Sequence, residues 1–298
     1  MNSPSTGNQV HNPVAVDAGI MVTAVVGALL AAKPVRERLA RYLPMDPESP
    51  VHALALVLAV LLFGTQAASI FFANPVVEEG TLSPLSVTDL VLQELPFVIL
   101  ALIGVGLYIR RGFRDSMVRL GLVRPAWWHL PLALAAAGVF IAFSQAMDYL
   151  GHTLTPGTAG QIDATTQHLY GALGGPVGIA ALALAPGICE EILFRGALQP
   201  RLGLLIPALL FASIHTQYGL SFDALAVLVI ALGLGLIRRY TNTTTTVICH
   251  VAYNLVVGIG IGSQVVGFAV AAELGLVAVV AYALWSIRRG RTSTTSAS

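Results

Sequence analysis

Glu190 and Glu191 are adjacent carboxylates inside an otherwise apolar stretch of the chain, residues 173–198. An ionised carboxylate at the centre of a bilayer costs roughly 2.5–3.5 kcal/mol on insertion scales, so a chain that keeps two is expected to use them. Arg195 follows Glu191 by four residues, which on a helix puts the two side chains on one face. Glu190 is rotated by about 100° from Glu191. One carboxylate can therefore be paired while the other is available for chemistry.

Two later segments add imidazoles. His215 ends an apolar run that has Phe211 one turn earlier, and His250 precedes Asn254 by four residues, so these two share a helix face. Counted from the expected inner ends of their helices, Glu190 and both histidines lie roughly 12–21 Å deep at a helical rise of about 1.5 Å per residue. These depths overlap near the middle of a hydrocarbon core about 30 Å thick, which permits one shared site.

A carboxylate, two imidazoles and an amide are the groups that peptide hydrolysis by an activated water needs. A glutamate can take the proton from the water, and a histidine or a histidine-bound metal can hold that water. Histidine and asparagine donors can stabilise the oxyanion of the tetrahedral intermediate. The pattern therefore predicts a peptide hydrolase.

Structural roles are the alternative for the same residues. The two glutamates could form a buried ion-pair network, and histidine and asparagine side chains often bond neighbouring helices in membranes. Phe211 is expected to pack in either case. Chemistry by a thiol is less favoured, because adjacent helical positions point about 100° apart and small residues suit tight helix contacts. The residues that we expect to pack rather than react are Cys189, Cys249, Glu94, Asp148 and Glu273.

The composition excludes an ordinary soluble domain. Of 298 residues, 56% are hydrophobic and 10% are charged, and the mean hydropathy is +0.78. The fold class expected is an all-α, polytopic integral membrane protein with about eight or nine transmembrane helices. The candidate spans are 14–32, 51–73, 90–108, 128–149, 175–198, 201–218, 221–237, 243–262 and 264–287.

The sixteen Lys and Arg residues give the expected orientation, because positive charge collects in cytoplasmic loops. They fall on alternate loops, which places the N-terminus outside and the C-terminus in the cytoplasm. Residues 1–13 have no Lys or Arg, so the first span is expected to be an uncleaved anchor rather than a signal peptide. A net charge of +1 gives no indication of nucleic-acid binding.

The two longer loops are expected to have structural rather than catalytic roles. The inner loop 109–127 has apolar residues at helical spacing among its arginines, which favours an interfacial helix. The outer loop 150–172 contains His152, Asp163 and His168; their irregular spacing favours a solvated connector over a metal site. Residues 1–13 and 292–298 are polar tails that we expect to be disordered.

Three motifs in order, EExxxR from Glu190, FxxxH from Phe211 and HxxxN from His250, resemble the type II CAAX prenyl endopeptidase and bacteriocin-processing family, also called CPBP or Abi. The resemblance covers about 170–262. It implies an intramembrane endopeptidase with a catalytic cavity open to the cytoplasmic side. The catalytic core would then be 170–262, preceded by transmembrane helices in 14–169 and followed by one in 263–291.

The resemblance also implies roles. Glu190 would activate the water with His215, while His250 and Asn254 would stabilise the oxyanion. Glu191 and Arg195 would form a structural pair. Members are described as metalloproteases, so zinc is the cofactor to test, with Glu190, His215 and His250 as ligands; the chain has no HExxH helix.

The expected function is a multi-pass membrane endopeptidase that cleaves peptide or protein substrates delivered at the membrane, with lipids and such substrates as its partners. One alternative is a non-catalytic scaffold, bacteriocin-immunity or regulatory protein that keeps the motif for structure. A proton-coupled transporter is the other; it should show paired broken helices in two similar halves, whereas the polar residues here lie in the second half.

Overall fold

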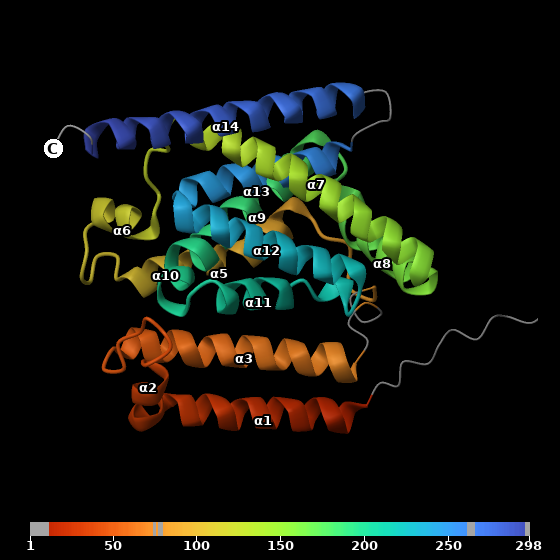
Figure 1. The fold of residues 1–298 in the computed structure, drawn as a ribbon. Helices are drawn as coiled ribbons and strands as arrows, with labels where there is room; N and C mark the ends of the chain where they lie inside the picture. The colour runs from red at the N-terminus through yellow and green to blue at the C-terminus, as the bar shows by residue number, and fades with distance from the viewer. Residues whose placement is uncertain (1–11, 74–75, 77–79, 261–265, 296–298) are drawn as a thin grey trace, which may run out of the picture. The chain divides into compact units, whose positions relative to one another are not determined.

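The computed structural model describes residues 12–73, 76, 80–260 and 266–295, and these form helices and connections without a β-strand (Figure 1). The fold is all-α, as expected. The helices are α1 Pro13–Ala31, α2 Lys33–Leu39, α3 Pro50–Phe72, α5 Val87–Val105, α6 Phe113–Leu120, α7 His129–Leu154, α8 Pro156–Tyr170, α9 Pro176–Glu191, α10 Gln199–Leu202, α11 Leu205–Ser213, α12 Phe222–Tyr240, α13 Thr243–Ile259 and α14 Val266–Thr295.

Six helices in the described residues are long and apolar enough to cross a membrane, which supports a polytopic membrane protein. They are Pro13–Ala31, Pro50–Phe72, Val87–Val105, His129–Leu154, Pro176–Leu202 and Ala269–Ile287. The expected span 243–262 corresponds to the shorter apolar helix α13. The expected span 221–237 corresponds to α12, which carries Asp223 near its start and Arg238 and Arg239 near its end.

The expected span 201–218 is broken into shorter pieces. Gly203 has a positive φ of 75° and separates α10 from α11, and α11 itself has only nine residues. The chain leaves the helix at His215, whose φ and ψ are −91° and 56°. A nine-residue helix rises about 14 Å, which is too short to cross the hydrocarbon core.

The predicted tails fall mostly outside the described residues. Residues 1–11 and 296–298 lie outside them, α1 begins at Pro13, and α14 continues through Thr295, inside the tail expected at 292–298. The helix expected in the inner loop is α6, which ends at Leu120 and is capped by Gly121 with a φ of 75°.

The chain divides into two compact units. Unit 1 comprises Met1–Ser86, Ser144–Ala172 and Ala197–Gly233, and unit 2 comprises Val87–Phe143, Leu173–Gly196 and Leu234–Ser298. In unit 1, α1 and α3 pack along their length, and small residues allow the close approach. A Cβ added to Gly64 of α3 would collide with Thr23 of α1.

In unit 2, α9 packs against α5 and α13. Gly187 of α9 permits this approach, because a Cβ there would lie 2.7 Å from Cγ2 of Val251 on α13. On the other side, the rings of Phe97 on α5 and Phe194 lie 5.9 Å apart. The helix that carries the glutamate pair is therefore enclosed by two neighbours.

The N-terminus of α13 is anchored by its threonines. The Asn242 side chain caps the helix by accepting from the Thr245 N–H at 2.9 Å. The hydroxyls of Thr243 and Thr244 donate to the carbonyls of Leu120 and Val123 at 2.5 and 2.8 Å. These bonds tie the start of α13 to the connection between α6 and α7 and so help to fix the helix that carries His250.

Candidate active site

The glutamate pair lies at the end of α9, where the helix widens into a π-helical segment, Ile192–Leu198. Such segments occur often at functional sites. Side chains here are withdrawn from the surface: Glu190 is 4% exposed, Glu191 0%, Arg195 1% and His250 7%. These four residues are called the Glu190–His250 cluster below. All of them belong to unit 2.

Glu191 and Arg195 form a buried ion pair. A guanidinium nitrogen of Arg195 lies 2.9 Å from Oε1 of Glu191, as the four-residue spacing indicates. Burying either charge alone is costly, and in the pair each charge compensates the other. Loss of either partner would therefore leave an uncompensated buried charge. Of the two glutamates, Glu191 is therefore the one whose charge is paired.

His250 lies between the two glutamates. Its Nδ1 is 3.1 Å from Oε1 of Glu191, and its Nε2 is 4.0 Å from Oε2 of Glu190. An ionised carboxylate can only accept a hydrogen bond, so we assign the Nδ1 proton to the contact with Glu191. Glu191 thus orients the imidazole, and Nε2 faces the other glutamate.

Glu190 is the less engaged carboxylate. Its Oε2 is buried and has no hydrogen-bond partner among the described residues. At 4.0 Å, its separation from Nε2 of His250 exceeds hydrogen-bond length. A buried carboxylate oxygen without a donor is costly, and it is suited to accept a proton or a donor that a substrate or water supplies.

Asn254 shares the face of α13 with His250, but its side chain has a bond of its own. Nδ2 donates to the carbonyl of Leu182 on α9 at 3.3 Å. In a regular helix that carbonyl would accept from the N–H of residue 186, which is Pro186 and has none. Asn254 therefore satisfies a backbone group that the proline frees, which is a structural role alongside the expected catalytic one.

His215 belongs to unit 1, where it follows α11. Its Nδ1 donates to the carbonyl of Phe211 at 2.8 Å. The His215 ring also lies 4.9 Å from the Phe211 ring and is parallel to the Tyr218 ring at 6.3 Å. The Phe211 carbonyl thus fixes the tautomer, and in the neutral ring Nε2 is the unprotonated nitrogen.

Glu94 is a residue that the sequence patterns assigned to packing. It lies on α5, is 8% exposed, and its buried Oε2 has no hydrogen-bond partner among the described residues. Its carboxylate is close enough to interact electrostatically with Glu190 and Cys189. The sequence around Glu94 gave no indication of this interaction, because it depends on how α5 packs against α9.

The cysteines form no disulfide with each other; Cys189 is half-buried and Cys249 is buried. Glu273 of α14 has its carboxylate against Gly138 of α7. Its Oε1 is another buried oxygen without a hydrogen-bond partner in the described part of the chain.

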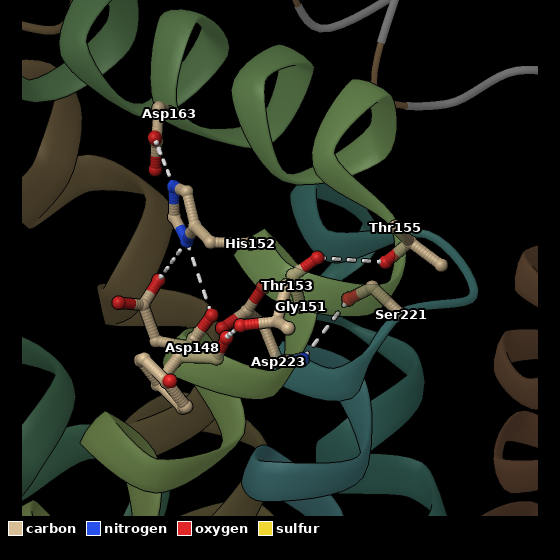
Figure 2. A network of polar contacts seen from close by, with 9 residues as sticks. Asp148, Gly151, His152, Thr153, Thr155, Asp163, Ser221 and Asp223 are labelled. Carbon is tan, nitrogen blue, oxygen red and sulfur yellow. Dashed lines mark hydrogen bonds and ion pairs between the residues drawn. The ribbon is translucent and has the colours of Figure 1, made fainter.

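Unit 1 holds a second group of titratable residues, Asp148, His152 and Asp163, called the Asp148–His152 cluster below (Figure 2). Nε2 of His152 lies 2.9 Å from Asp163 on α8, and Nδ1 lies 3.3 Å from Oδ1 of Asp148. The sequence analysis grouped His168 with His152 and Asp163, but His168 instead bonds the carbonyl of Leu82 at 2.8 Å. The ligand atoms of the cluster lie within 4.8 Å of one another, and all three side chains are exposed.

Unit 1 also contains a cavity of about 520 Å³. Its walls are mostly apolar and come from α3, α11 and the start of α12, including Phe63, Leu209 and Leu225. None of the predicted catalytic residues lines it. The catalytic cavity that the resemblance implies remains a prediction.

Residues 172–256 match the family model described as type II CAAX prenyl endopeptidase Rce1-like. The matched segment contains every predicted catalytic residue: Glu190, Glu191, Arg195, His215, His250 and Asn254. Comparisons with curated proteins and with solved structures gave no match. The family match confirms the resemblance seen in the three motifs. Residues 172–256 of this chain are therefore similar to the type II CAAX prenyl endopeptidase Rce1-like family.

Proposed function

We propose that this protein is a membrane endopeptidase in which the Glu190 carboxylate activates a water molecule for attack on a peptide bond. The observation that carries the proposal is the division of labour between the two glutamates. Oε1 of Glu191 lies 2.9 Å from Arg195 and 3.1 Å from Nδ1 of His250, whereas Oε2 of Glu190 lies 4.0 Å from Nε2 of His250. The Oε2 atoms of both glutamates have no hydrogen-bond partner among the described residues.

The proposed reaction begins with a water beside Glu190. The carboxylate takes a proton from the water as its oxygen attacks the scissile carbonyl carbon, and the protonated Glu190 then returns the proton to the leaving amine. A protonated His250 would donate Nδ1–H to Glu191 and Nε2–H to the oxyanion, and the second amide proton of Asn254 would assist. The ionised Glu191 would stabilise this imidazolium. His215 would assist Glu190 as the family resemblance implies.

Zinc is the proposed alternative source of water activation, with Glu190, His215 and His250 as its ligands. Both histidines have the outer contact common in metal-binding histidines, since Nδ1 of His250 bonds a carboxylate and Nδ1 of His215 a backbone carbonyl. When bound, zinc would supply a Lewis acid that acidifies water.

The location proposed for the protein is the cell membrane, with the N-terminus outside and the site open to the cytoplasm. The alternation of basic loops supports this orientation. Substrates would be peptides or membrane proteins delivered at that surface.

The test is cleavage of a quenched peptide by the purified protein in lipid nanodiscs. Glu190→Gln keeps the size of the side chain and removes the base, and we expect kcat to fall by about 10²–10⁴-fold. Glu273→Gln makes the same change at another intramembrane carboxylate and should cleave like wild type. His215→Ala should also lose cleavage while still inserting.

Full cleavage by Glu190→Gln would overturn the mechanism and favour a non-catalytic scaffold. A chelator arm separates the two sources of water activation. Cleavage that is lost on chelation and restored by zinc assigns the ion, and unchanged cleavage assigns the water to Glu190 without metal.

A further inference from the structure

Glu94 adds a third carboxylate to the surroundings of Glu190. The charged residues that interact electrostatically with Glu190 include Glu94, Glu191 and Arg195. Arg195 is engaged by Glu191 at 2.9 Å. Of the three carboxyl groups, Glu191 is the one that pairs with the guanidinium, and Glu94 and Glu190 each keep an oxygen without a hydrogen-bond partner in the described part of the chain.

The packing of α5 on α9 brings these two glutamates close enough to interact electrostatically. Phe97 follows Glu94 by three residues, Phe194 follows Glu190 by four, and the two rings lie 5.9 Å apart. Each glutamate therefore precedes the aromatic contact by about one turn of its own helix. Both side chains are more than nine-tenths buried, and each has an oxygen without a hydrogen-bond partner in the described part of the chain.

Buried carboxylates with unsatisfied oxygens are costly unless a donor or a cation reaches them. A peptide that enters beside Glu190 can bring such a group in one of its own side chains. A lysine or arginine side chain has an apolar stem for the helix walls and a cationic, donor-only head for the carboxylates. At substrate positions that face no carboxylate, the same cationic head would bind unfavourably.

We propose that Glu94, next to Glu190, forms an acidic subsite that selects a basic side chain of the substrate close to the scissile bond. This inference rests on the proposed function and names its substrate class: peptides with a lysine or arginine near the cleaved bond. Glu94 lies outside the segment that matches the family model, so the subsite would be a property of this chain's own N-terminal helices.

The test uses quenched peptides with an otherwise neutral sequence, in which a single lysine is moved one position at a time. Each peptide is compared with its norleucine counterpart, which keeps the apolar stem and removes the charge. Wild type should show one position at which lysine raises kcat/KM by about tenfold or more. Glu94→Gln should bring that ratio to about one, and Glu94→Asp should keep the preference because it retains the charge.

Two further variants make the result specific. Glu94→Lys should reverse the preference, so that glutamate at the selected position is cleaved faster than lysine. Glu273→Gln, which removes a different intramembrane carboxylate, should leave the lysine preference intact.

Failure of this inference is distinguishable from failure of the proposed function. If wild type cleaves no peptide at all, or if Glu190→Gln cleaves as well as wild type, the proposed function fails. If wild type cleaves without a lysine preference, or if Glu94→Gln slows every peptide by the same factor, the acidic subsite is wrong. If Glu94→Gln keeps the lysine preference of wild type, the acidic subsite is also wrong. Loss of bound zinc in that variant, with the preference kept, would assign Glu94 to the metal site instead.

Discussion

Two histidines of this chain each lie between two carboxylates, in opposite surroundings. His152 has Asp148 and Asp163 on either side, and these three side chains are 44–60% exposed (Figure 2). His250 has Glu190 and Glu191 on either side, and there every side chain is at most 8% exposed. The same trio of groups is therefore screened by water in one unit and withdrawn from it in the other.

The difference determines what each contact contributes. In the Asp148–His152 cluster, Nε2 of His152 contacts the carboxylate of Asp163, and Nδ1 contacts both the backbone carbonyl and the carboxylate of Asp148. Solvent also reaches these exposed groups and screens their charges. In the Glu190–His250 cluster, Glu191 is the carboxylate that pairs with Arg195. A charge on Glu190 would have to be neutralised by a proton, a cation or a substrate. Chemical reactivity is expected where charge is least satisfied, which is at Glu190.

Breaking the buried ion pair should have the largest effect on stability. Arg195→Met leaves Glu191 buried without its counter-charge, and we expect a loss of about 3–5 kcal/mol in the free energy of unfolding. Glu191→Gln with Arg195→Met removes both charges and should recover more than half of that loss. Denaturation of the reconstituted protein, followed by tryptophan fluorescence, measures both. A double variant no more stable than the single one would show that the pair does not act as a unit.

An intermediate effect is expected at Asn254, where structure and catalysis can be separated. Asn254→Ala leaves the Leu182 carbonyl without a donor and should cost about 1 kcal/mol. In a Pro186→Ala background the helix regains the N–H of residue 186, so the same substitution should cost almost nothing.

Cleavage by the two Asn254 variants completes that double-mutant cycle. An oxyanion role requires that Asn254→Ala lower kcat in both backgrounds, because the restored helix bond does not replace the lost donor. If the rate recovers together with the stability, Asn254 serves only to join α13 to α9.

The local features of the site could be predicted from the sequence, because they depend on helix periodicity. The four-residue spacing of Glu191 and Arg195 predicted the ion pair that the structure shows, and the composition predicted an all-helical membrane protein. The structure places His250 beside both glutamates, and the depth of these groups in the membrane stays a prediction. For His215, in unit 1, the depth estimate stays a prediction.

Features that depend on contact between distant segments could not be predicted. The approach of Glu94 to Glu190 follows from the aromatic contact between α5 and the end of α9, which a single sequence does not reveal. The acceptor of Asn254 depends on which α9 carbonyl Pro186 frees and on the register of α13 against it. A hydropathy window also could not detect the break between α10 and α11. The break comes from the positive φ of Gly203 and not from a polar residue.

The smallest effect is expected in the exposed cluster, and it tests whether burial is what separates the two histidines. Asp163→Asn removes one carboxylate partner of His152 and should change the free energy of unfolding by about 0.2–1 kcal/mol. Because water screens this contact, the difference should shrink further when salt is raised from low to about 1 M, where the Debye length is about 3 Å. Unfolding of wild type and variant at two salt concentrations measures it, with Asp115→Asn of α6 in unit 2 as a control. A loss as large as that of Arg195→Met, and insensitive to salt, would mean that the number of charges around a histidine, and not their burial, sets the energy of both clusters.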